Sequence, residues 1–140
     1  MNIAANTPWH VWAVGIVTLL FNAMGVFSYI MTQTGNLEAL GMTADQIAYF
    51  DTFPAWAHGV WALGVWGAFV GSILILLRSR FALASFAVAT VGLVGTTYFE
   101  LAVAEVPEEL QNPSLLVAIW VFTIGSLIYC WRMRAAGVLR

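Results

Sequence analysis

Charged side chains are missing from four long stretches of this chain, and that pattern restricts its fold more than any other feature. The stretches are Met1–Leu37, Thr52–Leu77, Phe81–Phe99 and Leu110–Trp131. A helix needs about 20 apolar residues, each adding about 1.5 Å, to cross the hydrocarbon core of a bilayer. Each of the four stretches is long enough for this. The sequence therefore predicts four membrane-spanning helices.

The composition agrees with a membrane location. Hydrophobic residues make up 61% of the chain and charged residues only 9%, with a mean hydropathy of +0.87. An average soluble domain has about 25% charged residues. We therefore expect an all-α membrane protein, an antiparallel bundle of four transmembrane helices with a short outer interfacial helix, as a single domain over residues 1–140. The expected spans are about 9–31, 54–77, 81–105 and 114–132.

The charges that remain are separated by sign. The cationic residues are Arg78, Arg80, Arg132, Arg134 and Arg140, in the second connection and after the fourth span. The acids other than Glu100 fall in the first and third connections; they are Glu38, Asp45, Asp51, Glu105, Glu108 and Glu109. Because arginine-rich segments stay in the cytoplasm, we expect a bacterial inner-membrane protein with both termini cytoplasmic. So few and scattered arginines predict no nucleic-acid partner.

The first connection contains a helix-start signal. Thr43 and Gln46 form a T-x-x-Q capping box, which predicts a short helix at about 43–51. Ile47 and Phe50 can reach into the membrane interface. This segment is interpreted as a connector lying flat on the outer surface, with a lid over a site as the alternative.

Small and polar residues follow one stripe of the first expected helix. Gly15, Thr18, Asn22, Gly25 and Tyr29 recur at spacings of three and four, so the stripe should face protein and not lipid. Asn22 lies near mid-depth, where an unpaired amide is costly, and it should form a hydrogen bond with another helix. The alternative role for Asn22 is a substrate ligand.

Glycines mark the packing faces of the spans. Gly64, Gly67 and Gly71 recur on the second expected helix and include a G-x-x-x-G pattern, which allows two helix backbones to approach closely. The residues assigned to helix packing are Gly15, Gly25, Gly64, Gly67, Gly71 and Gly92.

His58 and Glu100 should lie at one depth. The second and third expected helices are joined by a minimal turn centred on Ser79, and the two residues are equally far from it along an antiparallel pair. A His58–Glu100 hydrogen bond or ion pair near the outer face is therefore one hypothesis. Rotation argues for the alternative: if the glycine stripe faces the third helix, His58 lies about half a turn away and points elsewhere.

Glu100 has two open interpretations. An ionisable residue within a span is a candidate functional group, so Glu100, with His58 and Asn22, is a candidate proton or substrate site. However, the uncharged run Phe81–Phe99 already covers most of a hydrocarbon core, which would place Glu100 at its outer edge as a packing or boundary residue.

The sequence offers little for catalysis or metal binding. Cys130 is the only cysteine, which excludes a disulfide framework and a thiol redox pair. No nucleophile–base pair or metal-ligand set is visible. We therefore expect no enzyme activity, no cofactor and no metal site.

Two segments of the chain resemble a known family. WHVWAVGIVTLLFNAMGVFSYIMTQTGN and FPAWAHGVWALGVWGAFVGSILILLR are similar to sequences of small four-helix inner-membrane proteins of proteobacteria, whose members often carry the label "sugar transporter". The resemblance covers most of the first two expected helices and is weaker beyond them. It implies a four-helix inner-membrane protein and transfers no catalytic residue.

Three functions remain open at this point. A non-catalytic accessory or assembly component of a membrane complex would be a filled bundle with a large apolar surface matched to a partner. A dimeric carrier of small, sugar-like solutes, proton-coupled through Glu100, would have a polar cavity reaching mid-depth, lined by Asn22 with Glu100 or His58. A membrane enzyme is the third. The expected partners are the lipid bilayer and either a larger membrane complex or a second copy of the chain.

Overall fold

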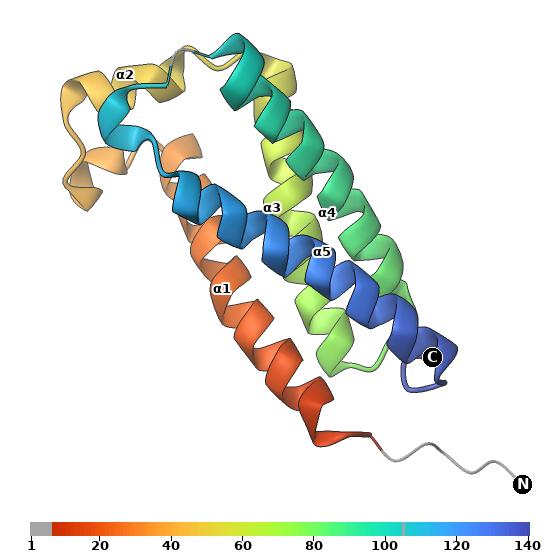
Figure 1. The fold of residues 1–140 in the computed structure, drawn as a ribbon. Coiled ribbons are helices and arrows are strands. Elements are labelled where there is room, and N and C mark those ends of the chain that lie inside the picture. The colour runs from red at the N-terminus through yellow and green to blue at the C-terminus, as the bar shows by residue number, and fades with distance from the viewer. Residues whose placement is uncertain (1–6, 105) are drawn as a thin grey trace, which may run out of the picture.

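The computed structural model describes residues 7–104 and 106–140, and within these ranges the chain is helical with no strand. Four helices dominate it, α1 (Trp9–Gln33), α3 (Ala55–Leu76), α4 (Phe81–Tyr98) and α5 (Pro113–Ala135), and they run antiparallel in chain order (Figure 1). Each is long and apolar enough to cross a membrane, α4 together with the turn that follows it. The all-α fold and the four spans are as predicted, and the chain is a membrane protein.

Shorter elements fill the connections. The 3-10 turn η1 (Leu37–Leu40) and the helix α2 (Ala44–Asp51) join α1 to α3. The capping box predicted for α2 is present: the Gln46 amide donates to the Thr43 hydroxyl, and the Thr43 amide donates to the Gln46 side chain. Between α4 and α5 lie the π-helical turn η2 (Phe99–Val103) and the 3-10 turn η3 (Glu108–Leu110).

The ends of the long helices follow local chemistry. Pro54 precedes α3, and Pro113 is the first residue of α5, where a missing amide proton costs nothing. The Asn112 side chain caps α5 by accepting from the Leu115 amide at 3.1 Å. α4 was expected to continue to residue 105, but regular helix stops at Tyr98 and η2 ends at Val103, where the backbone becomes extended before Pro107.

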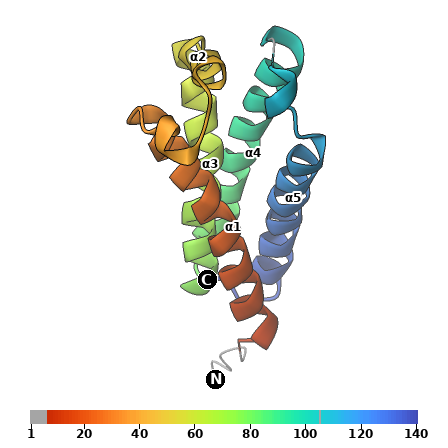
Figure 2. The same cartoon turned by 90° about the vertical axis from the view of Figure 1, so that its left-hand side faces the viewer.

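The four spans form an open arc and not a closed ring. α3 packs against α1 and α4, and α5 packs along α4, whereas the fourth interface, between α1 and α5, is the least developed. Figure 2 shows α1 and α5 approaching each other at the lower end and diverging upward. The bundle therefore has one open seam.

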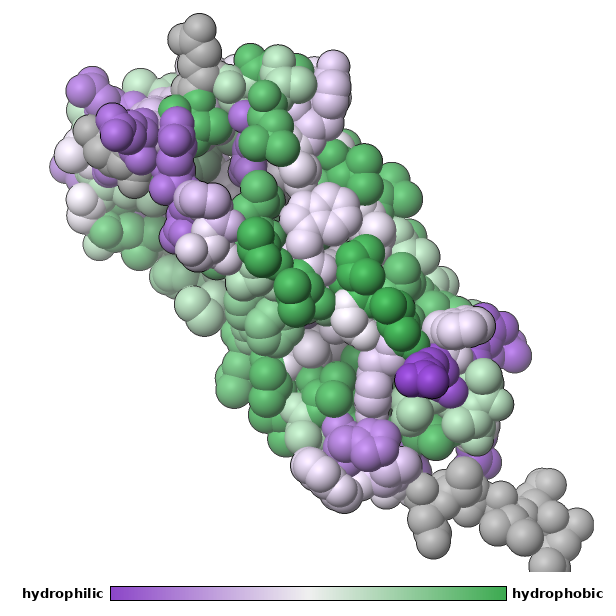
Figure 3. Space-filling model, in the orientation of Figure 1, coloured by the Kyte–Doolittle hydropathy of each residue, from purple (hydrophilic) through white to green (hydrophobic). Residues whose placement is uncertain are grey.

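The two ends of the bundle differ in charge. The arginine end carries Arg78, Arg80, Arg132, Arg134 and Arg140 around the α3–α4 turn and the residues after α5. The acidic end carries the two other connections, including α2. In Figure 3 hydrophilic residues gather at these two opposite ends, with mostly hydrophobic residues along the bundle between them. This is the surface that a membrane-spanning bundle requires.

The α3–α4 interface is the tightest in the bundle. A Cβ added at Gly92 would lie 2.6 Å from the Val60 carbonyl oxygen and against the Gly64 backbone, and one added at Gly67 would lie 3.0 Å from the Ala89 nitrogen. Gly71 faces the ring of Phe86. The glycine stripe of α3 therefore faces α4, with backbone packed on backbone.

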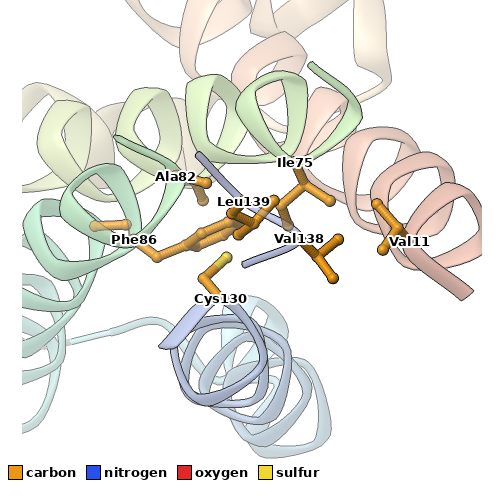
Figure 4. Packing of buried hydrophobic residues seen from close by; sticks show 9 residues of the cluster. Val11, Ile75, Ala82, Phe86, Cys130, Val138 and Leu139 are labelled. Carbon is orange, nitrogen blue, oxygen red and sulfur yellow. The ribbon is translucent and has the colours of Figure 1, made fainter. Parts of the chain in front are cut away.

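The core lies near the arginine end and includes residues beyond α5. Val138 and Leu139 fold back into the bundle and are buried, Leu139 at 2% exposure, beside Phe86 and Cys130 (Figure 4). The Arg140 amide donates to the Arg78 carbonyl at 2.9 Å. Residues 136–140 thus close this end of the bundle.

Candidate functional site

A polar cavity of about 250 Å³ lies at the acidic end, below α2. Its walls come from the last turn of α1, from η1, from α2 and from the first turns of α3; they are Thr32, Gln33, Gly35, Leu37, Ile47, Phe50, Asp51 and His58. The segment that was interpreted as a flat connector therefore forms one wall of a cavity, as in the lid alternative. Of the three candidate site residues, His58 lines this cavity and Asn22 and Glu100 do not.

Gln33 is the hydrogen-bond partner of His58. Nε2 of Gln33 lies 2.8 Å from Nδ1 of the imidazole. The imidazole also packs against the ring of Phe53, with centroids 5.4 Å apart. His58 therefore joins α3 to the end of α1 and to the segment after α2.

Glu100 lies at the expected level but does not pair with His58. The neighbouring residue, Phe99, packs its ring on Phe53 and Trp56, which places this turn of η2 beside the start of α3. Within residues 7–104 and 106–140 no hydrogen bond or ion pair joins the two side chains. The physical reason is rotation: the glycine stripe of α3 faces α4, so His58 points toward α1.

Glu100 instead lies near α2. Burial and, to a lesser degree, the negative charge of Glu100 raise the pKa of Tyr49 from 10.0 to about 12. Tyr49 also meets the rings of Phe50 and Phe53 edge to face, at centroid distances of 5.2 Å. Tyr49, Phe50 and Phe53 thus form an aromatic cluster near the half-buried Glu100, and Phe50 of this cluster also lines the polar cavity.

Glu100 is carried by the π-helical turn. The Ala104 amide donates to the Phe99 carbonyl five residues earlier at 2.7 Å, which widens the last turn of this span. Single π-helical turns occur often at functional sites. Glu100 therefore lies on an irregular turn at the acidic end of its span.

Asn22 joins α1 to α3. Its amide nitrogen donates to the Ala68 carbonyl at 3.1 Å and to the Ser72 hydroxyl at 2.8 Å. The hydrogen bond expected between two helices is therefore present, and both amide protons are in use. Gly15, Gly25 and Tyr29 of the same stripe face Leu76, Val65 and Trp61 of α3.

A second cavity, of about 400 Å³, occupies the open seam between α1 and α5. It is lined mainly by small and apolar side chains, which are Ala13, Val14, Val17, Thr18, Val121, Phe122, Gly125, Ser126 and Tyr129. We call it the seam groove. Nothing in the sequence predicted it, because the spans alone do not say which helices adjoin.

The seam groove is bridged at both ends. Toward the arginine end, Nδ1 of His10 lies 2.6 Å from the Tyr129 hydroxyl. Toward the acidic end, the rings of Phe21 and Phe122 stack with centroids 4.2 Å apart. Sequence reasoning missed His10, Tyr129 and Gln33, although a histidine near the start of one span and a tyrosine near the end of another were a usable signal of equal depth.

Comparisons with known proteins do not extend this picture. Neither models of protein families nor curated proteins nor solved structures match the chain.

Proposed function

We propose that the chain is a non-catalytic structural component of a larger membrane assembly. The observation that carries this proposal is the use of polar side chains within the spans. Asn22 donates from α1 to α3, Ser85 donates from α4 to the Gly67 carbonyl of α3 at 2.6 Å, and the Trp120 ring donates from α5 to Thr97 of α4 at 3.0 Å.

These bonds tie three pairs of helices together. Hydrogen bonds between helices stabilise membrane bundles by about 1 kcal/mol each. Among the described residues, every buried side-chain nitrogen or oxygen has a hydrogen-bond partner. Such an interior favours a rigid scaffold over a polar pathway. We place this scaffold in a bacterial inner membrane with the arginine end in the cytoplasm.

The test compares membranes with and without the chain. If the protein is a structural component, deleting its gene should lower the abundance or the apparent size of one membrane complex, measured by native electrophoresis and quantitative mass spectrometry. Re-expression of the wild-type chain should restore that complex. The proposal is wrong if no complex changes and the chain migrates alone at every detergent concentration.

The polar cavity at the acidic end favours a second candidate, a carrier of small, sugar-like solutes. Asp51, Gln33 and His58 offer hydrogen-bonding groups in a space of about 250 Å³. Uptake by proteoliposomes that falls with His58→Leu would support this role. Uptake that is unchanged by Glu100→Gln would exclude proton coupling through that carboxylate.

A further inference from the structure

The shape of the seam groove restricts what can occupy it. It lies between two membrane-spanning helices, and side-chain contacts bridge it at both ends, His10 with Tyr129 and Phe21 with Phe122. From His10 to Phe21 is about 16 Å along α1. A continuous partner helix would have to separate at least one of these bridges, because packed helix axes lie about 8–10 Å apart. A thin, flexible apolar chain fits between them.

The wall of the groove leaves room at Gly125. A Cβ added to Gly125 would meet no atom within 4 Å, although Gly125 lines the groove. Of the three hydroxyl-bearing side chains in the lining, Thr18, Ser126 and Tyr129, two are already engaged: the Thr18 hydroxyl donates to the Val14 carbonyl at 2.6 Å, and Tyr129 is bonded to His10. The open volume therefore offers apolar contact and little hydrogen bonding, which suits a hydrocarbon chain.

Charge marks one end of the groove. Arg132 follows Tyr129 by three residues on α5, so it lies on the next turn of a similar helix face. Its side chain is exposed, and in the described parts of the chain no ion pair with an acid is found. Arg78, Arg80, Arg134 and Arg140 lie at the same end. An anionic group at this depth would meet only positive side chains there.

We propose that the seam groove binds one acyl chain of an anionic phospholipid, whose phosphate lies beside Arg132. The acyl chain supplies the apolar contacts that α1 and α5 do not make with each other. The headgroup supplies a negative charge at the arginine end, where basic residues near a membrane surface attract anionic lipids. This lipid would act as part of the α1–α5 interface, independently of any protein partner.

The first experiment fills the groove. Gly125→Leu directs a Cβ into space that holds no atom within 4 Å and extends the side chain into the groove. Gly59→Leu is the matched control, because a Cβ at Gly59 of α3 also meets nothing within 4 Å but lies outside the groove. The full-length chain is titrated with phosphatidylglycerol and phosphatidylcholine of the same acyl chains, and bound lipids are counted by native mass spectrometry. We expect the wild type and Gly59→Leu to retain one phosphatidylglycerol that Gly125→Leu loses.

The second experiment tests the headgroup. Arg132→Gln should reduce the preference for phosphatidylglycerol over phosphatidylcholine by about fivefold, the effect of one basic residue near an anionic headgroup. Arg134→Gln is the control at the same end. Equal loss in both variants would show general attraction to the arginine end and would overturn the site at Arg132.

Photo-crosslinking of the wild type keeps the proposal falsifiable even if a variant misfolds. Phosphatidylglycerol with a photoreactive acyl chain should label peptides containing residues 121–129 of α5 and 13–18 of α1. Labelling spread evenly over all four spans would contradict a specific groove. The proposal would also be contradicted if Gly125→Leu and the wild type retained the same number of lipids. A side chain of a partner protein would then be the better occupant of the groove.

Discussion

Gln33 and His58 join the ends of two spans across the polar cavity, with 2.8 Å between Nε2 of the amide and Nδ1 of the imidazole. Their neighbours, Thr32 and Asp51, line the same space. The pair therefore holds the end of α1 against the start of α3 at the point where the first connection leaves the membrane. This relationship can be measured directly.

A double-mutant cycle with Gln33→Ala and His58→Ala should give a coupling energy of about 0.5–1 kcal/mol, the usual net value of one exposed hydrogen bond. The measurement is the free energy of unfolding in detergent. Thr34 lies next to the pair but bonds to Ile30 and Asn36 and not to His58, so the cycle of Thr34→Ala with His58→Ala is the control and should give no coupling. Additive effects of Gln33→Ala and His58→Ala would contradict the contact.

Asn22→Ala should destabilise the bundle by about 1 kcal/mol, because Ala68 and Ser72 lose a donor from α1. Asn36→Ala is the matched control: its amide bonds only to the neighbouring Thr34 in an exposed turn, so its effect should be within about 0.5 kcal/mol. Thermal unfolding of the three proteins in one detergent measures the difference. Equal stability of Asn22→Ala and wild type would show that the interhelical bond contributes nothing.

The two facing glycines of the α3–α4 interface should differ in their tolerance of a methyl group. Gly92→Ala directs a Cβ to 2.6 Å from the Val60 carbonyl oxygen, so the helices must separate, at a cost of about 1–3 kcal/mol. Gly64→Ala meets its nearest atom, the Leu93 nitrogen, at an ordinary 3.6 Å. We expect Gly64→Ala to remain near wild-type stability. The reverse order would show that the helices cross differently.

The Tyr49 hydroxyl should lose its proton at a higher pH than an exposed tyrosine does. Burial, assisted by the charge of Glu100, raises the pKa of Tyr49 from 10.0 to about 12, so the folded state keeps a proton that the unfolded state loses. This contribution to stability is complete below pH 10 and is lost as the pH rises toward 12. The difference in tyrosinate absorbance between wild type and Tyr49→Phe measures the titration. A difference that titrates near pH 10 would contradict the burial of this hydroxyl.

Glu100→Gln separates the two causes of that pKa shift. Because burial is the larger cause, the pKa of Tyr49 should fall in this variant but stay above 10. Glu108→Gln, in the same connection but exposed, is the control and should leave the titration unchanged. A fall to 10 in Glu100→Gln would assign the whole shift to the carboxylate.

Depth along the helices could be predicted from the sequence, and for α3 the glycine stripe also indicated the rotation. Counting from the α3–α4 turn placed Glu100 level with the start of α3, and the Phe99–Trp56 contact agrees with that level. Which way His58 points depends on which face of α3 packs on α4. The glycine stripe indicated that face, and the contact of Gly67 with Ala89 shows it.

Which helices are neighbours in space could not be predicted from the sequence. The stripe through Asn22 predicted a protein-facing side of α1 but did not name α3 as its neighbour. Four apolar spans are compatible with a closed ring or with an open arc, since lipid and protein interiors are equally apolar. The seam groove exists because the spans form an open arc. The spacing of residues along the sequence therefore could not predict it.

The two sides of the bundle differ in the order in which they can form and open. α3 and α4 are consecutive and joined by a turn in which Arg78 adopts a left-handed φ of 55°, so their contacts close a very short loop. α5 follows a longer connection and packs mainly along α4, with two side-chain bridges to α1. Local opening has the lowest free energy where an element has the fewest neighbours. Among the four spans, amide exchange should therefore be fastest in α5 and slowest in the α3–α4 hairpin. Unfolding would then begin at the seam, where α5 separates from the other three spans.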